Sequence, residues 1–276
     1  MIDIRQTPQY AKYLSKIEWE VERVAEINYF IKKFPLIGSI LKIQRPEEVG
    51  IKKIREITKK HRVFQVIVEP KNELDAKYLS SLGFKLTKAA YLPTKTLVLD
   101  LTKTEKRLLR GFKKDARYAI RKTKNLRTVE IKNVEKFRNE WKKSVGLRRY
   151  VPPLSHLTAL KNSFKKNCAF LVCFNNSNYR SEIIGGAIFL MAEMAAYYWQ
   201  AFTNKEGRRA LAQYKIVWEG IAWAKKRGAK VFDFEGIYDE RFPNKSWQGF
   251  THFKKSFGGD EIEYPGAFTK LSLLRF

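Results

Sequence analysis

The stretch that decides the fold is Val231-Phe232-Asp233-Phe234-Glu235-Gly236-Ile237, an apolar strand that ends in two carboxylates and a glycine. An aromatic strand, Tyr197-Tyr198-Trp199-Gln200, and a helix over residues 210–227 precede it. A second helix follows over residues 247–257 and ends at Gly258-Gly259. This order of strand, helix, strand and helix predicts a mixed α/β unit.

The first half of the chain repeats the same order of elements. Residues 40–43 predict a strand, 50–60 a helix, 63–68 a strand and 74–82 a second helix that ends at Gly83. The two halves have negligible sequence identity, so only the order of elements supports the repeat. With 276 residues and 44% hydrophobic content, the chain can form one large or two modest cores.

The charge of the chain favours a polyanionic partner. The 55 Lys and Arg residues and 28 Asp and Glu residues give a net charge of +27. Residues 101–150 contain 18 of these cations and only 5 acidic residues. Because the excess is local, a binding surface for nucleic acid or an anionic membrane is favoured over an evenly solvated surface.

A basic helix is predicted directly after the strand at residues 92–101. Thr102 and Glu105 match a capping box, which predicts that the helix begins at Thr102. Four apolar residues recur at helical spacing on one face: Leu108, Phe112, Ala116 and Ala119. Cations recur on another: Arg107, Arg110, Lys114, Arg117, Arg121 and Lys124. The second face is either a nucleic-acid contact or a solvated helix surface.

Several classes of site are disfavoured. The sequence has no Gly-x-x-x-x-Gly-Lys-Ser/Thr loop for ATP and no His-Glu-x-x-His helix, and its three histidines are scattered. Cys168 and Cys173 lie five apart on a strand and therefore point to opposite faces, so they cannot share a metal or form an easy disulfide. We therefore expect no metal and no resident cofactor.

The sequence also predicts a cytoplasmic protein. Two free thiols fit a reducing compartment, and the N-terminus lacks the pattern of a signal peptide. The most apolar segment, residues 183–199, is interrupted by Glu193 and is too short for a transmembrane span. It predicts a hairpin that turns near Ala192-Glu193.

The order and spacing of these motifs resemble the FemABX family of non-ribosomal peptidyltransferases. The resemblance rests on the pair Arg117-Tyr118 in the basic helix, on Gly146-Leu147-Arg148-Arg149 and on Phe253-Lys254 before Gly258-Gly259. It covers residues 90–270 by motif and the first 90 by element order and Arg45-Pro46. It implies two tandem GNAT-like domains, the first formed by residues 1–98 and completed by 262–276, the second by 99–261 with the catalytic cleft.

The resemblance also implies a reaction. Members of the family transfer an amino acid from aminoacyl-tRNA to a peptidoglycan precursor, which is UDP-MurNAc-pentapeptide or lipid II, without a cofactor. Only residues 126–150 separate the basic helix from Pro152-Pro153, so this chain resembles the compact members without a coiled-coil arm. An anionic acceptor at the membrane and the positive charge together suggest peripheral contact with the inner membrane surface.

Site residues follow from the same resemblance. Lys254 is expected to stabilise the oxyanion beside Phe253, with Lys255 as the competitor, since adjacent helical side chains point about 100° apart. One of Arg148 and Arg149 is expected to bind the acceptor diphosphate. The tRNA-binding residues are expected on the basic helix, where we name Arg110, Lys114, Arg117, Arg121 and Lys124.

Three further residues have open roles. Asp233 and Glu235 either orient the attacking amine or accept its proton, or, for Asp233, only cap a neighbouring helix. Tyr198 either stacks on the terminal adenine or packs in the core, and strand alternation predicts that it points away from Tyr197 and Trp199.

Two other functions are also compatible with the sequence. A GNAT-type acyl-CoA transferase needs a phosphate-binding turn after the central strand, but residues 204–210 begin with Asn204 and carry Glu206 and Arg209 where small residues are required. Coenzyme A is therefore disfavoured. A noncatalytic RNA-binding protein would need the basic helix alone. The amino acid transferred, the acceptor and the oligomeric state are not specified by the sequence.

Overall fold

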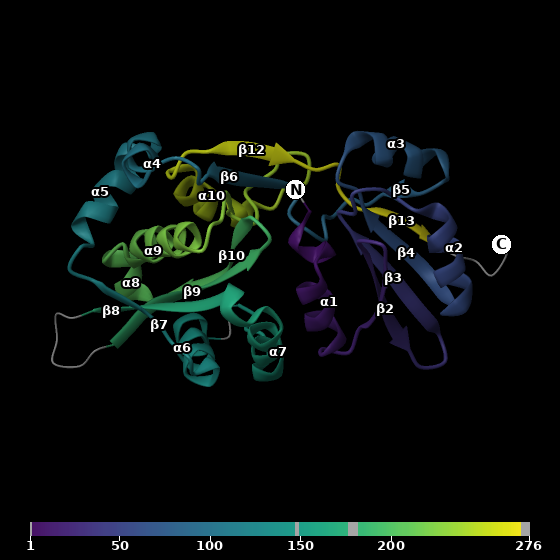
Figure 1. Ribbon diagram of the computed structural model, residues 1–276, viewed down its shortest axis with the longest axis horizontal. Helices are drawn as coiled ribbons and strands as arrows, with labels where there is room; N and C mark the ends of the chain where they lie inside the picture. The colour runs from purple at the N-terminus through teal and green to yellow at the C-terminus, as the bar shows by residue number, and fades with distance from the viewer. Residues whose placement is uncertain (1, 147–148, 176–181, 272–276) are drawn as a thin grey trace. The chain divides into compact units, whose positions relative to one another are not determined.

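The computed structural model describes residues 2–146, 149–175 and 182–271, which form two compact units (Figure 1). The first unit takes its residues from 1–95, 239–243 and 263–276, and the second from 96–238 and 244–262. The chain therefore crosses between the units more than once. Each unit contains one β-sheet with helices packed against it.

The first unit is built on a six-stranded sheet. Its spatial order is β1 (Glu20–Val24), β2 (Ile27–Phe34), β3 (Gly38–Gln44), β4 (Val63–Glu69), β13 (Phe268–Leu271) and β5 (Lys85–Leu86). Its helices are the 3-10 turn η1 (Ile4–Gln6), α1 (Pro8–Ser15), α2 (Ile51–Lys60) and α3 (Glu73–Ser81). The predicted strands and helices of the first half are thus present, whereas β1, β2 and α1 were not predicted.

Helix α2 makes β3 and β4 parallel neighbours, because it carries the chain back along the sheet. It buries Ile54 and Ile57 against the sheet, while its lysines face water. The last strand, β13, pairs antiparallel with both β4 and β5. The first sheet therefore includes a strand from the end of the chain.

A buried ion cluster holds the first unit together near its N-terminus. Asp3 pairs with Arg5 and Arg45 at 3.1 Å each, and both arginines are almost fully buried. Arg45 also donates to the carbonyl of Pro93 at 2.5 Å and lies 3.6 Å from the ring centre of Tyr264. Burial alone raises the pKa of Asp3, but the two arginines hold it below its ordinary value.

The second unit is built on a seven-stranded sheet. Its spatial order is β12 (Asp260–Glu263), β6 (Lys95–Asp100), β11 (Val231–Asp233), β10 (Ala195–Thr203), β9 (Glu182–Ala192), β8 (Cys168–Asn175) and β7 (Arg127–Glu130). Its longer helices are α6 (Val134–Val145), α7 (Leu154–Phe164) and α9 (Ala212–Lys226). Its shorter helices are α4 (Glu105–Gly111), α5 (Lys114–Lys122), α8 (Lys205–Arg209) and α10 (Gln248–Lys255), with 3-10 turns η2 (Lys165–Asn167) and η3 (Lys245–Trp247).

The core of the second unit lies between α9 and the central strands. Phe189, Phe232, Phe234 and Phe257 are completely buried there. Gly220 of α9 faces Phe189 so closely that a Cβ would lie 2.2 Å from the ring. This glycine therefore permits the close packing of the helix on β9.

The sheet of the second unit splits at its centre, and this split positions the site. Strands β10 and β11 run parallel but pair only from Ala195 to Tyr197, opposite Val231 to Asp233. Beyond that point β10 continues to Thr203, with an irregularity between Tyr198 and Gln200 in its pairing with β9. The two strands therefore separate, and the backbone groups after Asp233 need other partners.

Two predictions about the apolar strands are confirmed. Strands β9 and β10 form the predicted hairpin, which turns at Glu193 and Met194. Cys168 and Cys173 both lie on β8 and are free and buried. No helix in the described ranges combines the length and the apolar character that a membrane span requires.

Two helix predictions are wrong in detail. The basic segment forms two helices, α4 and α5, which are interrupted at Phe112 and Lys113, and the cap is Thr104 instead of Thr102. The hydroxyl of Thr102 instead donates to the carboxylate of Asp100, and Thr104 accepts from the N–H of Arg107. The helix predicted over 210–227 begins at Ala212, since Leu211 adopts a left-handed conformation with φ 58° after the short helix α8.

Candidate functional site

A cavity of about 820 Å³ opens in the second unit at the end of β10. Residues from β10, α6, α8, α9, η3 and α10 line it, including the cation Arg208 of α8, together with Arg149, Tyr150 and Glu235 from loops. Eight aromatic side chains contribute to its wall: Trp141, Tyr150, Tyr198, Trp199, Phe202, Trp247, Phe250 and Phe253. Such an aromatic wall with few charges is typical of a ligand site.

Lys254 is the buried cation of this cavity. Its residue is only 8% exposed, and its Nζ donates to the carbonyl oxygens of Phe234 and Gly236 at 2.6 Å each. These are carbonyls beyond the point at which β11 stops pairing with β10. The ring centres of Phe250 and Tyr198 lie 4.9 and 5.7 Å from the same nitrogen, which adds cation–π attraction.

Burial lowers the pKa of Lys254 to about 8, although the negative charges of Glu235 and Asp233 act in the opposite direction. The group is therefore still mostly cationic at pH 7. An ammonium group has three N–H donors, and two of them are used by the carbonyls. Lys254 can thus present positive charge to a bound molecule without leaving its position.

Lys255, the other lysine considered for the oxyanion role, lies outside the cavity. Its ammonium group pairs with Glu261, and its side chain is 37% exposed. Lys255 does not line the cavity, whereas Phe253 does. Phe253 packs against Tyr214 and Phe257, with ring centres 4.8 and 5.4 Å apart. The helix geometry that predicts only one inward-facing lysine is therefore observed, with Lys254 inside.

The two carboxylates at the end of β11 have different surroundings: Glu235 lines the cavity and Asp233 does not. Asp233 is 3% exposed, accepts from the hydroxyl of Thr96 and from the backbone N–H of Glu235, and does not line the cavity. The carboxylate of Asp233 therefore fixes the turn. Glu235 does line the cavity and has φ 59°, an uncommon value outside glycine, which turns its side chain out of the strand direction.

Tyr198 faces both the core and the cavity. Its hydroxyl accepts from the Nε2 of Gln213 at 2.6 Å, and burial raises its pKa above the ordinary value. That Tyr198 points away from Trp199 stays a prediction, because all residues from Tyr198 to Thr203 line the cavity. The irregularity between Tyr198 and Gln200 breaks the strict alternation of the strand. Tyr197 is fully buried and lies away from the cavity.

Only one of the two expected phosphate-binding arginines is described. Arg149 is exposed and lines the cavity mouth next to Tyr150. Arg148 lies outside the described residues. Gly146 ends α6 with φ 56°, a conformation that favours glycine.

Several cavity residues were not predicted, and two of them have unpaired buried polar atoms. The indole Nε1 of Trp141 and the amide Oε1 of Gln213 have no hydrogen-bond partner among the described residues. Trp247 and Phe250 precede Lys254 on the same helical segment. The spacing of Phe250, four residues before Lys254, was a signal that could have identified it. Trp141 and Gln213 come from distant helices and carried no such signal.

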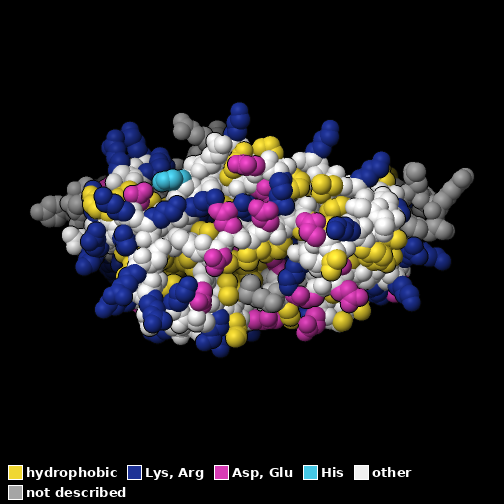
Figure 2. All heavy atoms as spheres, turned by 90° about the horizontal axis from the view of Figure 1, so that it is seen from above, with side chains coloured by type: hydrophobic (Ala, Val, Ile, Leu, Met, Phe, Trp, Pro, Cys, Tyr) yellow, Lys and Arg dark blue, Asp and Glu magenta, His cyan; other side chains and the backbone are white. Residues whose placement is uncertain are grey.

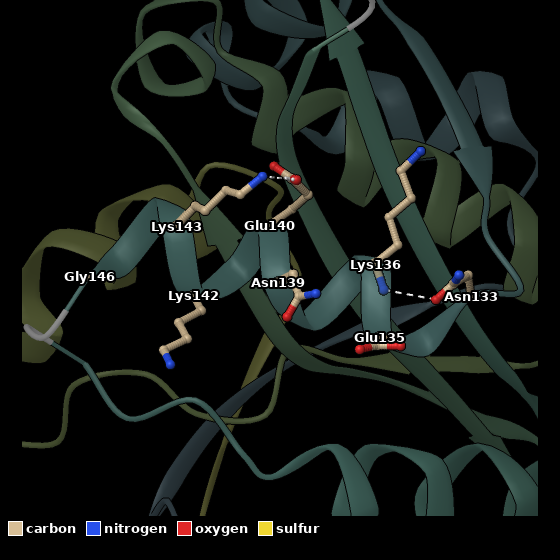
Figure 3. A pocket seen from close by; sticks show the side chains of 8 residues that line it. All are labelled: Asn133, Glu135, Lys136, Asn139, Glu140, Lys142, Lys143 and Gly146. Atoms are coloured by element: carbon tan, nitrogen blue, oxygen red, sulfur yellow. Dashed lines mark hydrogen bonds and ion pairs between the residues drawn. The ribbon is translucent and has the colours of Figure 1, made fainter.

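A second hollow lies along the outer face of α6 (Figure 3). Its side chains project outward from the helix, and the dashed lines mark the Lys143–Glu140 ion pair and the cap from Lys136 N–H to Asn133. These are ordinary helix-surface interactions. We therefore interpret this face of α6 as a solvated helix surface. The opposite face of α6 contributes Trp141 to the cavity.

The predicted stripe of cations is exposed on α4, on α5 and in the turn that follows α5, where Lys124 lies. Arg110, Lys114, Arg117, Arg121 and Lys124 are all exposed, while the alternate face buries Leu108, Phe112, Ala116 and Ala119. Figure 2 shows Lys and Arg side chains gathered over the side of the second unit where these helices lie. Within the described ranges, none of the five cations forms an ion pair with an acidic side chain.

In the loop at residues 204–210, where a coenzyme A transferase would have its phosphate-binding turn, side chains of the loop itself make the hydrogen bonds. Asn204 accepts from the N–H of Gly207 at 2.7 Å and caps α8. Glu206 accepts from the amide of Asn175. A Cβ on Gly207 would lie 2.0 Å from the carbonyl of Ile184, so the turn is pressed against β9. The backbone donor of Gly207 is thus already used and a carboxylate stands nearby.

One group of metal-ligand type is present in the described part of the chain, and it lies in the first unit. It consists of Glu20, Glu22 and His61. Glu22 already pairs with Lys60 at 2.7 Å and contacts the ring Nε2 of His61 at 2.6 Å. Glu20 pairs with Lys33 at 2.5 Å. The local cations neutralise these carboxylates, so we interpret the group as an ion-pair network.

The FemAB family model matches residues 130–272 of this chain. The chain belongs to the FemAB family. This match includes α6, the split sheet and α10 with Lys254. The resemblance inferred from the motifs is therefore confirmed.

The chain is also similar in sequence to a curated aminoacyltransferase and in fold to solved structures. It is 28% identical to the aminoacyltransferase FemA of Staphylococcus epidermidis over 87 residues, which are 32% of this chain and 21% of FemA. The chain thus matches about a fifth of the length of that curated relative. The solved structure of FemX matches with a TM-score of 0.82 and 17% identity, covering 98% of this chain and 92% of FemX.

A tandem GNAT protein from the clavulanic acid biosynthesis pathway matches with a TM-score of 0.54 and 10% identity, covering 89% of this chain and 78% of that protein. At these identities the structural matches establish the fold alone. The fold is mixed α/β with two GNAT-like units in tandem, as predicted.

Proposed function

We propose that this protein transfers an aminoacyl group from aminoacyl-tRNA to the peptide of a peptidoglycan precursor. The family and its FemA relative support an aminoacyltransferase of peptidoglycan bridge formation. The observation that carries the proposal is the buried, doubly anchored ammonium of Lys254 in an aromatic cavity. A solvated surface lysine would show neither the burial nor the lowered pKa.

The chemistry needs a fixed cation. The amine of the acceptor attacks the ester carbonyl of the donor, forming a C–N bond, and negative charge develops on the carbonyl oxygen. The bond to the 3′ oxygen of the terminal adenosine then breaks, and the proton lost by the amine balances the alkoxide that leaves as a hydroxyl. Lys254 stabilises the oxyanion, because a preorganised cation in a water-poor cavity is worth more than one in water.

The other residues of the cavity take supporting roles in this proposal. Glu235 orients the attacking amine and accepts its proton, since its side chain lines the cavity. Asp233 acts through the turn that it holds with Thr96, and so is a positioning residue. Phe253 and Tyr198 form the aromatic wall on which the donor's terminal adenine stacks. Arg149 binds a phosphate of the acceptor.

The donor is proposed to be tRNA-bound for two reasons. The exposed cations on α4 and α5 suit a phosphate backbone. The loop at residues 204–210 uses its own Asn204 and Glu206 side chains where coenzyme A would need free backbone donors. Because aminoacyl-tRNA is a cytoplasmic donor, we place the reaction in the cytoplasm, without a cofactor. The acceptor is UDP-MurNAc-pentapeptide or lipid II.

The proposal is tested by offering both donors in parallel. The protein is incubated with UDP-MurNAc-pentapeptide and either charged bulk tRNA or acetyl-CoA, and the acceptor is analysed by mass. We expect a mass increase of one amino-acid residue with tRNA alone, and no binding of coenzyme A by calorimetry. Acetylation of any amine acceptor, or micromolar binding of coenzyme A, would instead favour the acyl-CoA transferase. RNA binding without either product would favour the noncatalytic reading.

A further inference from the structure

The tip of the β2–β3 hairpin in the first unit exposes aliphatic side chains. Leu36 is fully exposed at 105% and Ile37 is 70% exposed, while Phe34 at the end of β2 is 37% exposed. Single apolar residues on a surface are ordinary. Two adjacent aliphatic residues at the projecting end of a hairpin form a concentrated apolar tip, which we define as residues 34–37.

The tip is held in place by the strand beside it. The N–H of Ser39 donates to the carbonyl of Arg62 at 3.2 Å, and a Cβ on Gly38, which has φ 117°, would lie 2.4 Å from the same oxygen. The ring of Phe34 packs on that of Phe64 with 6.1 Å between their centres. The base of the tip is therefore anchored, and Leu36 and Ile37 project beyond it.

The backbone conformation of Leu36 also indicates that the tip has a role other than folding. Its φ of 66° lies in the left-handed region, where glycine or asparagine is less costly. A turn selected only for folding would be expected to carry one of those residues. Leu36 thus combines an unfavourable backbone conformation with an unfavourable exposure, and neither stabilises the folded unit.

Cations surround the tip. A hollow of about 500 Å³ at its base is lined by Lys33, Lys60 and Arg62, and Lys59 is exposed on the last turn of α2. Lys33 and Lys60 pair with carboxylates of β1. Within the described ranges, Lys59 and Arg62 form no ion pair. The surface near the tip is therefore net positive, and its charge complements an anionic partner.

We propose that the β2–β3 hairpin is a docking site for an anionic lipid membrane. Leu36 and Ile37 enter the boundary between headgroups and acyl chains, and the cations beside them contact lipid phosphates. Nucleic acid would use the same cations but would leave the aliphatic pair in water. The proposal does not rest on aminoacyl transfer, because membrane binding is measured without donor or acceptor.

A fluorescent label at the tip tests insertion directly. The two native cysteines are buried, so Ile37→Cys supplies one reactive thiol for a polarity-sensitive fluorophore. Leu74→Cys is the matched control, since Leu74 is 80% exposed in the same unit but lies between Glu73 and Asp75. With vesicles that contain phosphatidylglycerol, we expect a blue shift for the label at position 37 and none at position 74.

Binding measurements provide the second arm. In vesicle sedimentation, the double change Leu36→Ser and Ile37→Ser is expected to lower partitioning by about tenfold or more, because an aliphatic side chain contributes strongly when it leaves water. Lys59→Gln with Arg62→Gln is expected to weaken the dependence on phosphatidylglycerol, and Leu74→Ser to change nothing. If the protein sediments with vesicles while position 37 keeps its aqueous emission, other basic surfaces bind and the proposal is wrong. Absence of vesicle binding overturns it as well.

Discussion

At the level of single residues, the proposed site depends on Lys254 and its buried ammonium group. A buried lysine is costly unless carbonyls or aromatic rings replace its water. Phe234 and Gly236 supply the carbonyls, and Phe250 and Tyr198 supply the rings. The carbonyls are available because β10 and β11 separate after Asp233. The split of the sheet and the position of the cation are thus parts of one arrangement.

The lowered pKa of Lys254 predicts how stability depends on pH. Below pH 8 the lysine is charged in the folded and unfolded protein, and the folded state bears the cost of burying the charge. Between about 8 and 10.5 the folded protein loses this proton first, so the unfolded state binds more protons and stability rises with pH. Relative to Lys254→Met, the wild type should gain on the order of 3 kcal/mol across this window.

Denaturant unfolding of both proteins at several pH values checks this expectation. Lys255→Met is the control, because Lys255 is the neighbouring lysine of the same helix but does not line the cavity. A difference between wild type and Lys254→Met that stays constant from pH 7 to 10.5 would contradict the assigned burial of charge.

Asp233 is predicted to act through the turn. Its carboxylate binds the hydroxyl of Thr96 and the N–H of Glu235, so Asp233→Asn and Thr96→Val should each lower the free energy of unfolding by about 1 to 3 kcal/mol. Thr96→Val removes the donor of the Thr96–Asp233 contact and Asp233→Asn removes the charge of its acceptor, so the double variant should lose less than the sum. Steady-state transfer assays accompany the unfolding series. A rate loss in Asp233→Asn far beyond that of Thr96→Val would return Asp233 to a catalytic role.

At the level of single residues, the sequence identified those whose neighbours lie close in the chain. Lys254 was separated from Lys255 by helix geometry, and the observed burial agrees. Trp141 and Gln213 could not be found in this way, because α6 and α9 approach the cavity only after the sheet has formed. The irregularity in β10 between Tyr198 and Gln200 could not be predicted either, because it arises in the pairing of β10 with β9.

At the level of elements, periodicity predicted which face of the basic segment is buried but not where the segment breaks. Phe112 follows α4 and has an extended backbone conformation. Its buried ring packs on Trp218 and Phe257. The break keeps the apolar face continuous, and so it leaves no mark in the spacing of Leu108, Phe112 and Ala116. Tertiary packing therefore decides the interruption.

The stripe on α4 and α5 is predicted to bind the phosphates of tRNA. Replacing Arg110, Lys114, Arg117, Arg121 and Lys124 with Gln should weaken tRNA binding and reduce the slope of log affinity against log salt by about one unit per lost contact. Filter binding at several salt concentrations measures both quantities. Lys52→Gln with Arg55→Gln on α2 is the control, and a minimal aminoacylated donor should still react. An unchanged salt slope in the quintuple variant would identify the stripe as a solvated face.

The packing of α9 on the sheet is predicted to be intolerant of a single methyl group. Gly220→Ala places a Cβ 2.2 Å from the ring of Phe189, so it should destabilise the protein by about 1 to 3 kcal/mol. Gly249→Ala in α10 meets no atom within 4 Å and should stabilise by up to about 1 kcal/mol. Thermal unfolding distinguishes the two. Equal effects from both changes would mean that α9 is not packed as described.

At the level of the whole molecule, element order predicted the tandem fold better than any one motif. Each unit has a parallel strand pair joined through a helix, β3 with β4 and β10 with β11. The excess of positive charge in residues 101–150 predicts an anionic partner for that segment, and this stays a prediction. The pairing of β13 with β4 and β5 is a contact between distant segments, and local sequence patterns carry little information about such register.

The central claim is that the buried cation of the second unit stabilises the transition state of aminoacyl transfer. It is tested most directly by single-turnover transfer from aminoacyl-tRNA to UDP-MurNAc-pentapeptide, with wild type, Lys254→Ala and Lys255→Ala compared at pH 7. We predict that Lys254→Ala slows product formation roughly 100- to 1000-fold with tRNA affinity retained, and that Lys255→Ala stays close to wild type. Near-normal turnover by a folded Lys254→Ala protein would contradict the account.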